Sequence, residues 1–149
     1  MLMIELTEKQ IDAERIRLAV SSPKCGAIVL FLGTTRQFTD AKETLTLSYT
    51  AYSPMARSQM EKLAAQAQAR WPVEKCAIAH RLGDVPIGEA SVAVAVSSPH
   101  RRDAFEAASW LMDRLKELVP VWKKEHWADG GTDWVHPGLS PPAGQNGVQ

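Results

Sequence analysis

The sequence is poor in several features that mark particular classes of protein. It has two cysteines among 149 residues, Cys25 and Cys76, and they do not form a C-x-x-C pair. A chain of this length buries enough apolar surface to fold without disulfides, so we expect both to be buried, reduced thiols. No apolar run approaches the roughly 20 residues that span a bilayer, and the N-terminus lacks a signal-peptide pattern. The sequence therefore predicts a soluble, cytoplasmic protein.

An excess of charge is also absent. Seventeen Lys and Arg residues balance seventeen Asp and Glu residues, which leaves a formal net charge of zero. With this balance, the overall charge of the protein cannot drive binding to nucleic acid or to an anionic membrane. Any anion-binding site must therefore be local. Low net charge also leaves little repulsion between copies and favours association.

Motifs for metal binding and nucleophilic catalysis are missing. The histidines, His80, His100, His126 and His136, show neither H-x-x-x-H nor Cys/His ligand spacing. There is no G-x-S-x-G elbow and no phosphate-binding P-loop. We expect neither a metal nor a cofactor.

The hydrophobic pattern predicts one domain over residues 1–136, followed by a Pro/Gly-rich tail, 137–149, that we expect to be disordered. Helices are expected at 7–20, where Thr7 and Gln10 would form a capping box, at 54–70, and from the segment after Pro99 to Leu118. Strands are expected at 25–33, 44–52, 76–83, 90–98, 121–127 and 133–135, with a mobile loop at 34–43. This order predicts an α+β fold, a mixed sheet with helices packed on one side.

For several of these segments, the sequence also predicts which faces are buried. The continuous apolar run 25–33 is typical of a central strand buried on both faces. The segment 44–52 alternates as a half-buried strand does, and the small residues of 90–98 indicate a helix packed closely on one face. In the helix that ends at Leu118, the residues expected to face the core are Ala104, Phe105, Ala108, Leu111, Met112 and Leu115.

The stretch "SSPHRRDAF" places His100, Arg101 and Arg102 in the first turn of a helix. Ser97 or Ser98 could cap this helix, and Pro99 suits its first position. Cations oppose the helix dipole there by roughly 0.3–1 kcal/mol each, and a bound phosphate would remove the conflict. Solvated or salt-bridged arginines are the alternative, and from this stretch alone both interpretations stay open.

Two lysines and one further arginine are candidate functional residues, but the sequence patterns around them are less specific. Lys116 lies in the last turn of the predicted helix, where lysines are usually solvated. In the strand 121–127, Lys123 would face the opposite way from Trp122 and Lys124, so one of these two lysines can point into a cleft. A partly desolvated lysine near other cations is a plausible base or nucleophile, although solvated lysines are the simpler interpretation. Arg36, after Gly33, is a weak anion-binding candidate.

Taken together, four segments resemble the large, catalytic subunit of molybdopterin synthase. They are "GAIVLFLGTTR", "LSYTAYSPMA", the long run from "IAHRLGDVPIGEA" through "SSPHRRDAFEA" to "LKELVPVWKKE", and "DWV". The match covers nearly everything from Gly26 to Val135, in order. One departure is Thr50, which stands where relatives often carry an acid, and we assign it no role.

The resemblance implies an α/β-hammerhead fold and a homodimer in which each copy binds a small ubiquitin-like subunit, giving a heterotetramer. The small subunit's Gly-Gly tail, carried as a thiocarboxylate, would enter the pocket and pass sulfur to cyclic pyranopterin monophosphate. The product is the dithiolene of molybdopterin, made in molybdenum cofactor biosynthesis without a metal in the synthase. By position, Lys116 and Lys123 match the family's catalytic lysines, and Arg36, His100 and Arg101 match its substrate-binding pocket.

Two other interpretations compete with a sulfurtransferase. A non-catalytic module could bind a phosphorylated small molecule through His100 and Arg101 without needing the lysines. A scaffold could use the same turn only for salt bridges to a sister subunit. Binding and turnover measured separately on lysine variants would distinguish them.

Overall fold

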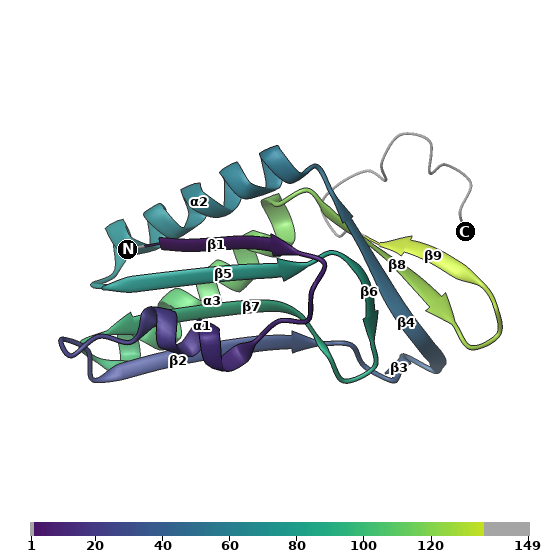
Figure 1. Cartoon of the computed structure of the whole chain (residues 1–149), viewed down its shortest axis with the longest axis horizontal. Coiled ribbons are helices and arrows are strands. Elements are labelled where there is room, and N and C mark those ends of the chain that lie inside the picture. The colour runs from purple at the N-terminus through teal and green to yellow at the C-terminus, as the bar shows by residue number, and fades with distance from the viewer. Residues whose placement is uncertain (1, 136–149) are drawn as a thin grey trace.

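The computed structural model describes residues 2–135 as two sheets and three helices (Figure 1). The first sheet has four strands in the order β1-β5-β7-β2, which are β1 (Leu2–Thr7), β5 (Lys75–Arg81), β7 (Ala90–Ser98) and β2 (Ala27–Thr34). The second contains β3 (Phe38–Thr39), β4 (Lys42–Ala51), β8 (Val121–Trp127) and β9 (Thr132–Val135), and β6 (Gly83–Pro86) also pairs with β4. The β1–β5 pair is parallel and the other pairs are antiparallel, so pairing is mixed.

The helices cover both faces of the first sheet. Helices α2 (Ser53–Arg70) and α3 (Arg101–Leu118) pack on the face that carries Val94 and Val96. Helix α1 (Ala13–Val20) packs on the opposite face, where Ile16 and Val20 contact Ala77, Ala79, Ala93 and Ala95. The α+β class is confirmed, and so is the close helix against the small residues of β7. The prediction that the helices all pack on one side of the sheet is wrong, because α1 packs on the face opposite α2 and α3.

The first helix begins later than the sequence pattern predicts. Thr7 belongs to β1, because the segment Leu2–Thr7 pairs in parallel with β5. The helix begins after Asp12, whose carboxylate accepts a hydrogen bond from the backbone N–H of Arg15 at 3.1 Å. A tertiary strand pairing therefore overrides the local capping signal at Thr7 and Gln10.

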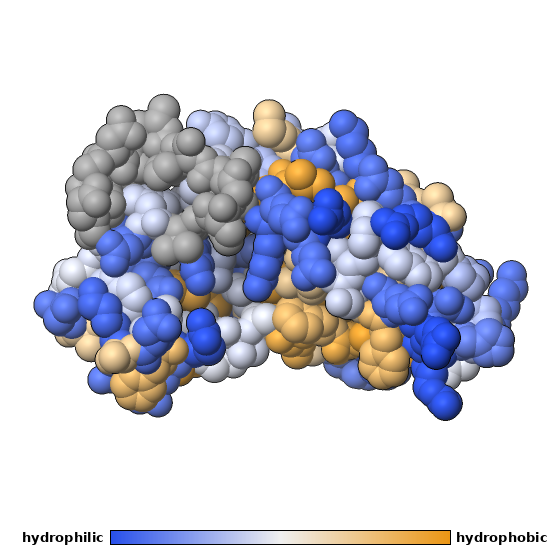
Figure 2. All heavy atoms as spheres, turned by 180° about the vertical axis from the view of Figure 1, so that it is seen from behind, coloured by the Kyte–Doolittle hydropathy of each residue, from blue (hydrophilic) through white to orange (hydrophobic). Residues whose placement is uncertain are grey.

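The apolar strand β2 lies at the edge of its sheet rather than at the centre. Ile28, Phe31 and Leu32 remain 37–40% exposed along it, and Phe105 of α3, predicted to face the core, is 61% exposed. Figure 2 shows apolar side chains gathered along the lower edge of the molecule, on the side where β2 lies. The prediction of a central strand buried on both faces is wrong, because no residue of Ala27–Thr34 is fully buried and an edge strand stays uncovered within one chain.

Three local features also differ from what the sequence predicts. A shift in register between Thr44 and Thr46 interrupts the alternation of β4, so Leu45 is exposed while Leu47 is buried. In β7, the ladder runs on through Ser97 and Ser98, both fully buried, so the helix cap falls at His100. The segment 34–43, expected to be a loop, contains the short strand β3 and the start of β4.

Helix α2, strands β5 and β7 and the antiparallel pair β8–β9 match the prediction closely, whereas β6 was not predicted. Cys76 is buried and Cys25 is partly buried, and both are free thiols. Within residues 2–135, no helix is both long and apolar enough to cross a membrane. The predicted tail, 137–149, and His136 lie outside the described residues. Pro120, between α3 and β8, turns the chain from the first sheet into the second, and this junction positions the site.

Candidate active site

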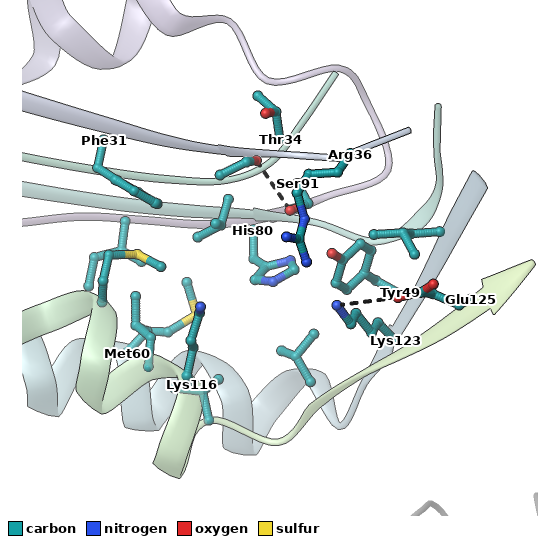
Figure 3. Close-up of a pocket in the computed structure, with 18 of the residues that line it drawn as sticks. Phe31, Thr34, Arg36, Tyr49, Met60, His80, Ser91, Lys116, Lys123 and Glu125 are labelled. Atoms are coloured by element: carbon teal, nitrogen blue, oxygen red, sulfur yellow. Dashed lines mark hydrogen bonds and ion pairs between the residues drawn. The ribbon is translucent and has the colours of Figure 1, made fainter. Parts of the chain in front are cut away.

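A pocket of about 470 Å³ lies where the two sheets meet the end of α3. Its walls come from both sheets and from α2 and α3, so residues far apart in sequence surround one space (Figure 3). Apolar walls with a few converging polar groups are typical of small-molecule sites. The charged residues that line it are Arg36, Lys116, Lys123 and Glu125.

Lys123 reaches the pocket because of the alternation of β8. Its neighbours turn away from the pocket, since Trp122 packs edge-on against Tyr52 and the Lys124 ammonium lies 5.6 Å from the ring centroid of Trp134. The register pairs Lys123 with Tyr49 of β4, which also lines the pocket. The prediction that one of the two lysines enters a cleft is confirmed, and that lysine is Lys123.

The charges around Lys123 act in opposite directions on its ammonium group. Burial lowers the pKa of Lys123, and the Glu125 carboxylate, 3.8 Å away, works against this by favouring the charged form. Arg36 and Lys116 lower the pKa further, which is possible only because their cations lie close by. Three cations from separate elements therefore converge on one pocket, and their surroundings make Lys123 easier to deprotonate than an ordinary lysine.

Lys116 enters the same pocket from the last turn of α3. Its helix places it beside Met112 and Leu115 on the pocket wall, and the chain then turns at Val119 toward β8. Figure 3 shows the Lys116 side chain extending into the space between Met60 and His80. Lys116 thus lines the cleft and remains exposed to solvent, as a last-turn lysine usually is.

Arg36 is positioned by the turn that follows β2. The register of β2 shifts between Gly33 and Thr34, and a Cβ on Gly33 would lie 2.7 Å from Val92 Cγ1, so the close approach requires glycine. The next residue, Thr35, is buried; its hydroxyl donates to Val85 O at 3.2 Å and its N–H to Glu89 O at 3.1 Å. This anchored turn, like other bulges beside sites, directs Arg36 over the pocket.

His100 and Arg101 do not lie in this pocket within one chain. They begin α3, and Lys116 lies near its other end, roughly 22 Å away at 1.5 Å of rise per residue. Both residues are exposed and, among the described residues, neither forms an ion pair. A single chain therefore unites Arg36, Lys116 and Lys123 and leaves the basic turn at the far end of the helix.

Sequence reasoning missed three titratable residues of the pocket: Tyr49, His80 and Glu125. The alternation of β8 could have indicated Glu125, since it shares a face with Lys123. Tyr49 and His80 pack edge-on, with ring centroids 4.9 Å apart. Burial raises the pKa of Tyr49, Glu125 raises it further, and a hydrogen bond with Ser91 opposes both. Across the described residues, no group of three or more His, Cys, Asp or Glu is arranged to hold a metal ion.

Comparison with known proteins shows which family this chain belongs to. A family model described as MoaE protein matches residues 6–118. The molybdopterin synthase catalytic subunit of Bacillus subtilis (strain 168) is 43% identical over 143 residues, covering 96% of this chain and 90% of that protein. The crystal structure of molybdopterin synthase from Staphylococcus aureus superposes with a TM-score of 0.83 at 38% identity, covering 87% of this chain and 94% of that one.

A more distant structure supports the fold alone. It is a complex of subunits 1 and 2 of the molybdopterin-converting factor from Helicobacter pylori 26695, with a TM-score of 0.68 at 22% identity, covering 99% of this chain and 97% of that chain. The resemblance predicted from the sequence is confirmed by the nearer relatives. Because the family model spans more than half of the chain and the relatives cover most of it, the chain belongs to the MoaE family, the catalytic subunits of molybdopterin synthase.

Proposed function

We propose that this chain transfers sulfur from a thiocarboxylated small subunit to cyclic pyranopterin monophosphate and so makes the dithiolene of molybdopterin. The observation that carries the proposal is the convergence of Arg36, Lys116 and Lys123 on one pocket in a member of the MoaE family. Preorganised cations in a partly desolvated site stabilise both a phosphorylated substrate and the negative charge that develops during acyl transfer.

The sulfur donor is the Gly-Gly terminus of a small ubiquitin-like subunit, one copy on each catalytic chain. The relatives of this chain are named as catalytic subunits of molybdopterin synthase, which supports a second subunit in the assembly of this chain too. An extended Gly-Gly tail is narrow enough to enter a pocket walled by both sheets and by α3. Holding its thiocarboxylate beside the pterin would convert a bimolecular encounter into a positioned reaction.

In each transfer, the thiocarboxylate sulfur forms a bond to a side-chain carbon of the pterin. At the carbon at the carbonyl level of oxidation, the oxygen leaves as water. At the neighbouring carbon, the bond to the cyclic phosphate oxygen breaks, and the phosphate opens to a monoester that stays on the product. Water then attacks the carbonyl carbon of the resulting thioester. The acyl carbon–sulfur bond breaks, the small subunit leaves as a carboxylate, and the sulfur stays on the pterin as a thiolate. Two small subunits supply the two sulfurs, and no oxidant or reductant is consumed.

The pocket's cations divide these tasks by their environment. Arg36 presents a forked guanidinium suited to a phosphate. Lys116 would stabilise the negative charge that forms on the thiocarboxylate carbonyl. Because its pKa is lowered, Lys123 gives up a proton more easily than an ordinary lysine does, which suits it to proton transfer. We therefore propose Lys116 and Lys123 as catalytic residues and Arg36 as a substrate-binding residue.

His100 and Arg101 enter the proposal through a homodimer. Strand β2 has an unpaired edge with exposed apolar side chains, which a second copy would cover. We propose that the basic turn of one chain completes the pocket of the other, where both residues would bind the anionic substrate. With one small subunit on each chain, the assembly would be a heterotetramer.

The test mixes the protein with a thiocarboxylated small subunit and cyclic pyranopterin monophosphate and assays the dithiolene product. Product formation that depends on all three components is expected. Substrate binding without product, by the wild-type protein and lysine variants alike, would instead support the non-catalytic binding module. Cytoplasmic location and a single domain over residues 1–136 stay predictions, which cell fractionation and limited proteolysis would check.

A further inference from the structure

His80 is a polar residue of the pocket to which the proposed sulfur transfer gives no role. It lies near the end of β5 and lines the pocket, and Figure 3 shows its ring projecting inward between Lys116 and Tyr49. The edge-on contact with Tyr49, with centroids 4.9 Å apart, fixes the plane of the imidazole. A ring held in this way presents one defined atom to a ligand.

The backbone determines which nitrogen that atom is. Nδ1 of His80 lies 2.9 Å from the carbonyl oxygen of Arg81. A carbonyl oxygen can only accept a hydrogen bond, so Nδ1 carries the proton. In the neutral ring, Nε2 is then an acceptor, and no other described residue makes a hydrogen bond to it. The distal edge of the ring therefore offers an unused lone pair to the pocket.

The ring stays neutral because of its surroundings. Burial lowers the pKa of His80 to about 4, and the hydrogen bond to Arg81 opposes this only in part. The cationic groups of Arg36, Lys116 and Lys123 line the same pocket. All three are hydrogen-bond donors without acceptor capacity in their charged forms.

Two of the pocket's other acceptors, the Glu125 carboxylate and the Ser91 hydroxyl, already make hydrogen bonds. The Glu125 carboxylate accepts from the hydroxyls of Thr39 at 3.4 Å and Thr44 at 3.2 Å and pairs with Lys123. The Ser91 hydroxyl donates to Gly33 O at 3.3 Å. His80 is thus a free acceptor in a pocket whose cations suit an anion, and it would recognise a different part of the ligand.

We propose that His80 Nε2 accepts a hydrogen bond from an N–H group of the bound pterin, either on the ring or on its amino substituent. This inference rests on the proposed function, since it assigns the cations to the phosphate end of the substrate and His80 to its heterocycle. A phosphate without an N–H donor would gain nothing from His80. The residue would therefore provide specificity for the pterin rather than affinity for anions.

The experiment compares His80→Phe, which keeps an aromatic ring against Tyr49 but removes the acceptor, with His80→Gln, whose amide oxygen restores one. His80→Leu is a second acceptor-free variant in case the phenyl ring disturbs folding, which melting temperatures would report. Calorimetry measures the binding of cyclic pyranopterin monophosphate and of inorganic phosphate to each full-length protein. Turnover with the thiocarboxylated small subunit gives kcat and KM separately.

Loss of one hydrogen bond should raise the pterin's Kd and KM roughly tenfold in His80→Phe and His80→Leu, with partial recovery in His80→Gln. Phosphate binding and affinity for the small subunit should not change. Wild-type Kd for the pterin in both acceptor-free variants would overturn the inference, as would equal losses in all three variants. A wild-type protein that binds pterin through His80 but makes no dithiolene would refute the proposed function while supporting the inference.

Discussion

The Lys123 ammonium lies 3.8 Å from the carboxylate of Glu125, two residues further along the same face of β8. The Glu125 side chain is 3% exposed and also accepts hydrogen bonds from Thr39 and Thr44. One buried anion therefore fastens the β3–β4 hairpin to β8 and at the same time favours the charged form of the lysine. Hairpin position and lysine protonation depend on the same carboxylate.

Glu125→Gln should shift the pH dependence of turnover. Glu125 raises the pKa of Lys123 against the lowering effects of burial, Arg36 and Lys116, so removing the anion lowers that pKa further. If neutral Lys123 is the active form, the acidic limb of the kcat profile moves to lower pH. An unchanged limb, or one that moves to higher pH, would show that Lys123 is not the titrating group.

Lys123→Ala should reduce kcat by about 10²- to 10⁴-fold, the range typical of a lost proton-transfer group. Lys124→Ala is the matched control, because the next residue of β8 faces Trp134 rather than the pocket. Steady-state dithiolene formation measures both, and circular dichroism checks that both fold. Similar losses in the two variants would contradict the assignment of Lys123.

Two inactive variants should complement each other if the basic turn completes the pocket of a second copy. A mixed dimer of His100→Ala and Lys123→Ala contains one pocket with both wild-type residues and one with neither. Mixing the proteins under conditions that exchange subunits should therefore restore part of the dithiolene formation, and light scattering should show a dimer. Mixtures as inactive as their components would place His100 outside the shared site.

His80 should make the protein less stable in acid. Its pKa is about 4 in the folded chain against 6.5 ordinarily, so between these pH values the unfolded chain binds a proton that the folded chain does not. Stability should therefore fall as pH drops from 6.5 to 4, by about 3 kcal/mol in total from this residue. Urea unfolding across that interval should show a shallower slope for His80→Phe than for wild type, and equal slopes would contradict this account of His80.

Ala93→Leu should destabilise the fold by about 1–3 kcal/mol, the usual effect of overpacking. Ala93 is fully buried beneath α1, where Ile16 and Val20 approach β7. Denaturant unfolding measures the loss. Ala90→Leu is a partly exposed control on the same strand and should cost less. Equal losses would mean that close packing beneath α1 is not the cause.

The sequence pattern predicted those residues of the site whose orientation follows from a local period. Alternation along 121–127 separated Lys123 from Lys124, and helical spacing put Lys116 in a last turn. Residues that depend on long-range pairing were harder to predict. His80 and Tyr49 come from different sheets and meet only because β5 and β4 approach at the pocket.

Errors about strands have the same origin. An apolar run such as Ala27–Thr34 does not show how many neighbours the strand will have, so its place at the sheet edge was not predicted. The bulge near Leu45 and the late start of α1 depend likewise on partners far away in the sequence. Within one chain His100 lies at the far end of α3 from the pocket, so its predicted place in the pocket would require a second copy.

Helix α3 carries the basic turn at one end and Lys116 at the other. A straight helix of 18 residues is rigid, so no rotation of side chains within one copy can close that gap. If the basic turn of one copy completes the pocket of another, a single chain has an incomplete active site. Specific activity would then decline on dilution even while every molecule stays folded, and protein concentration in the cell would itself control the reaction.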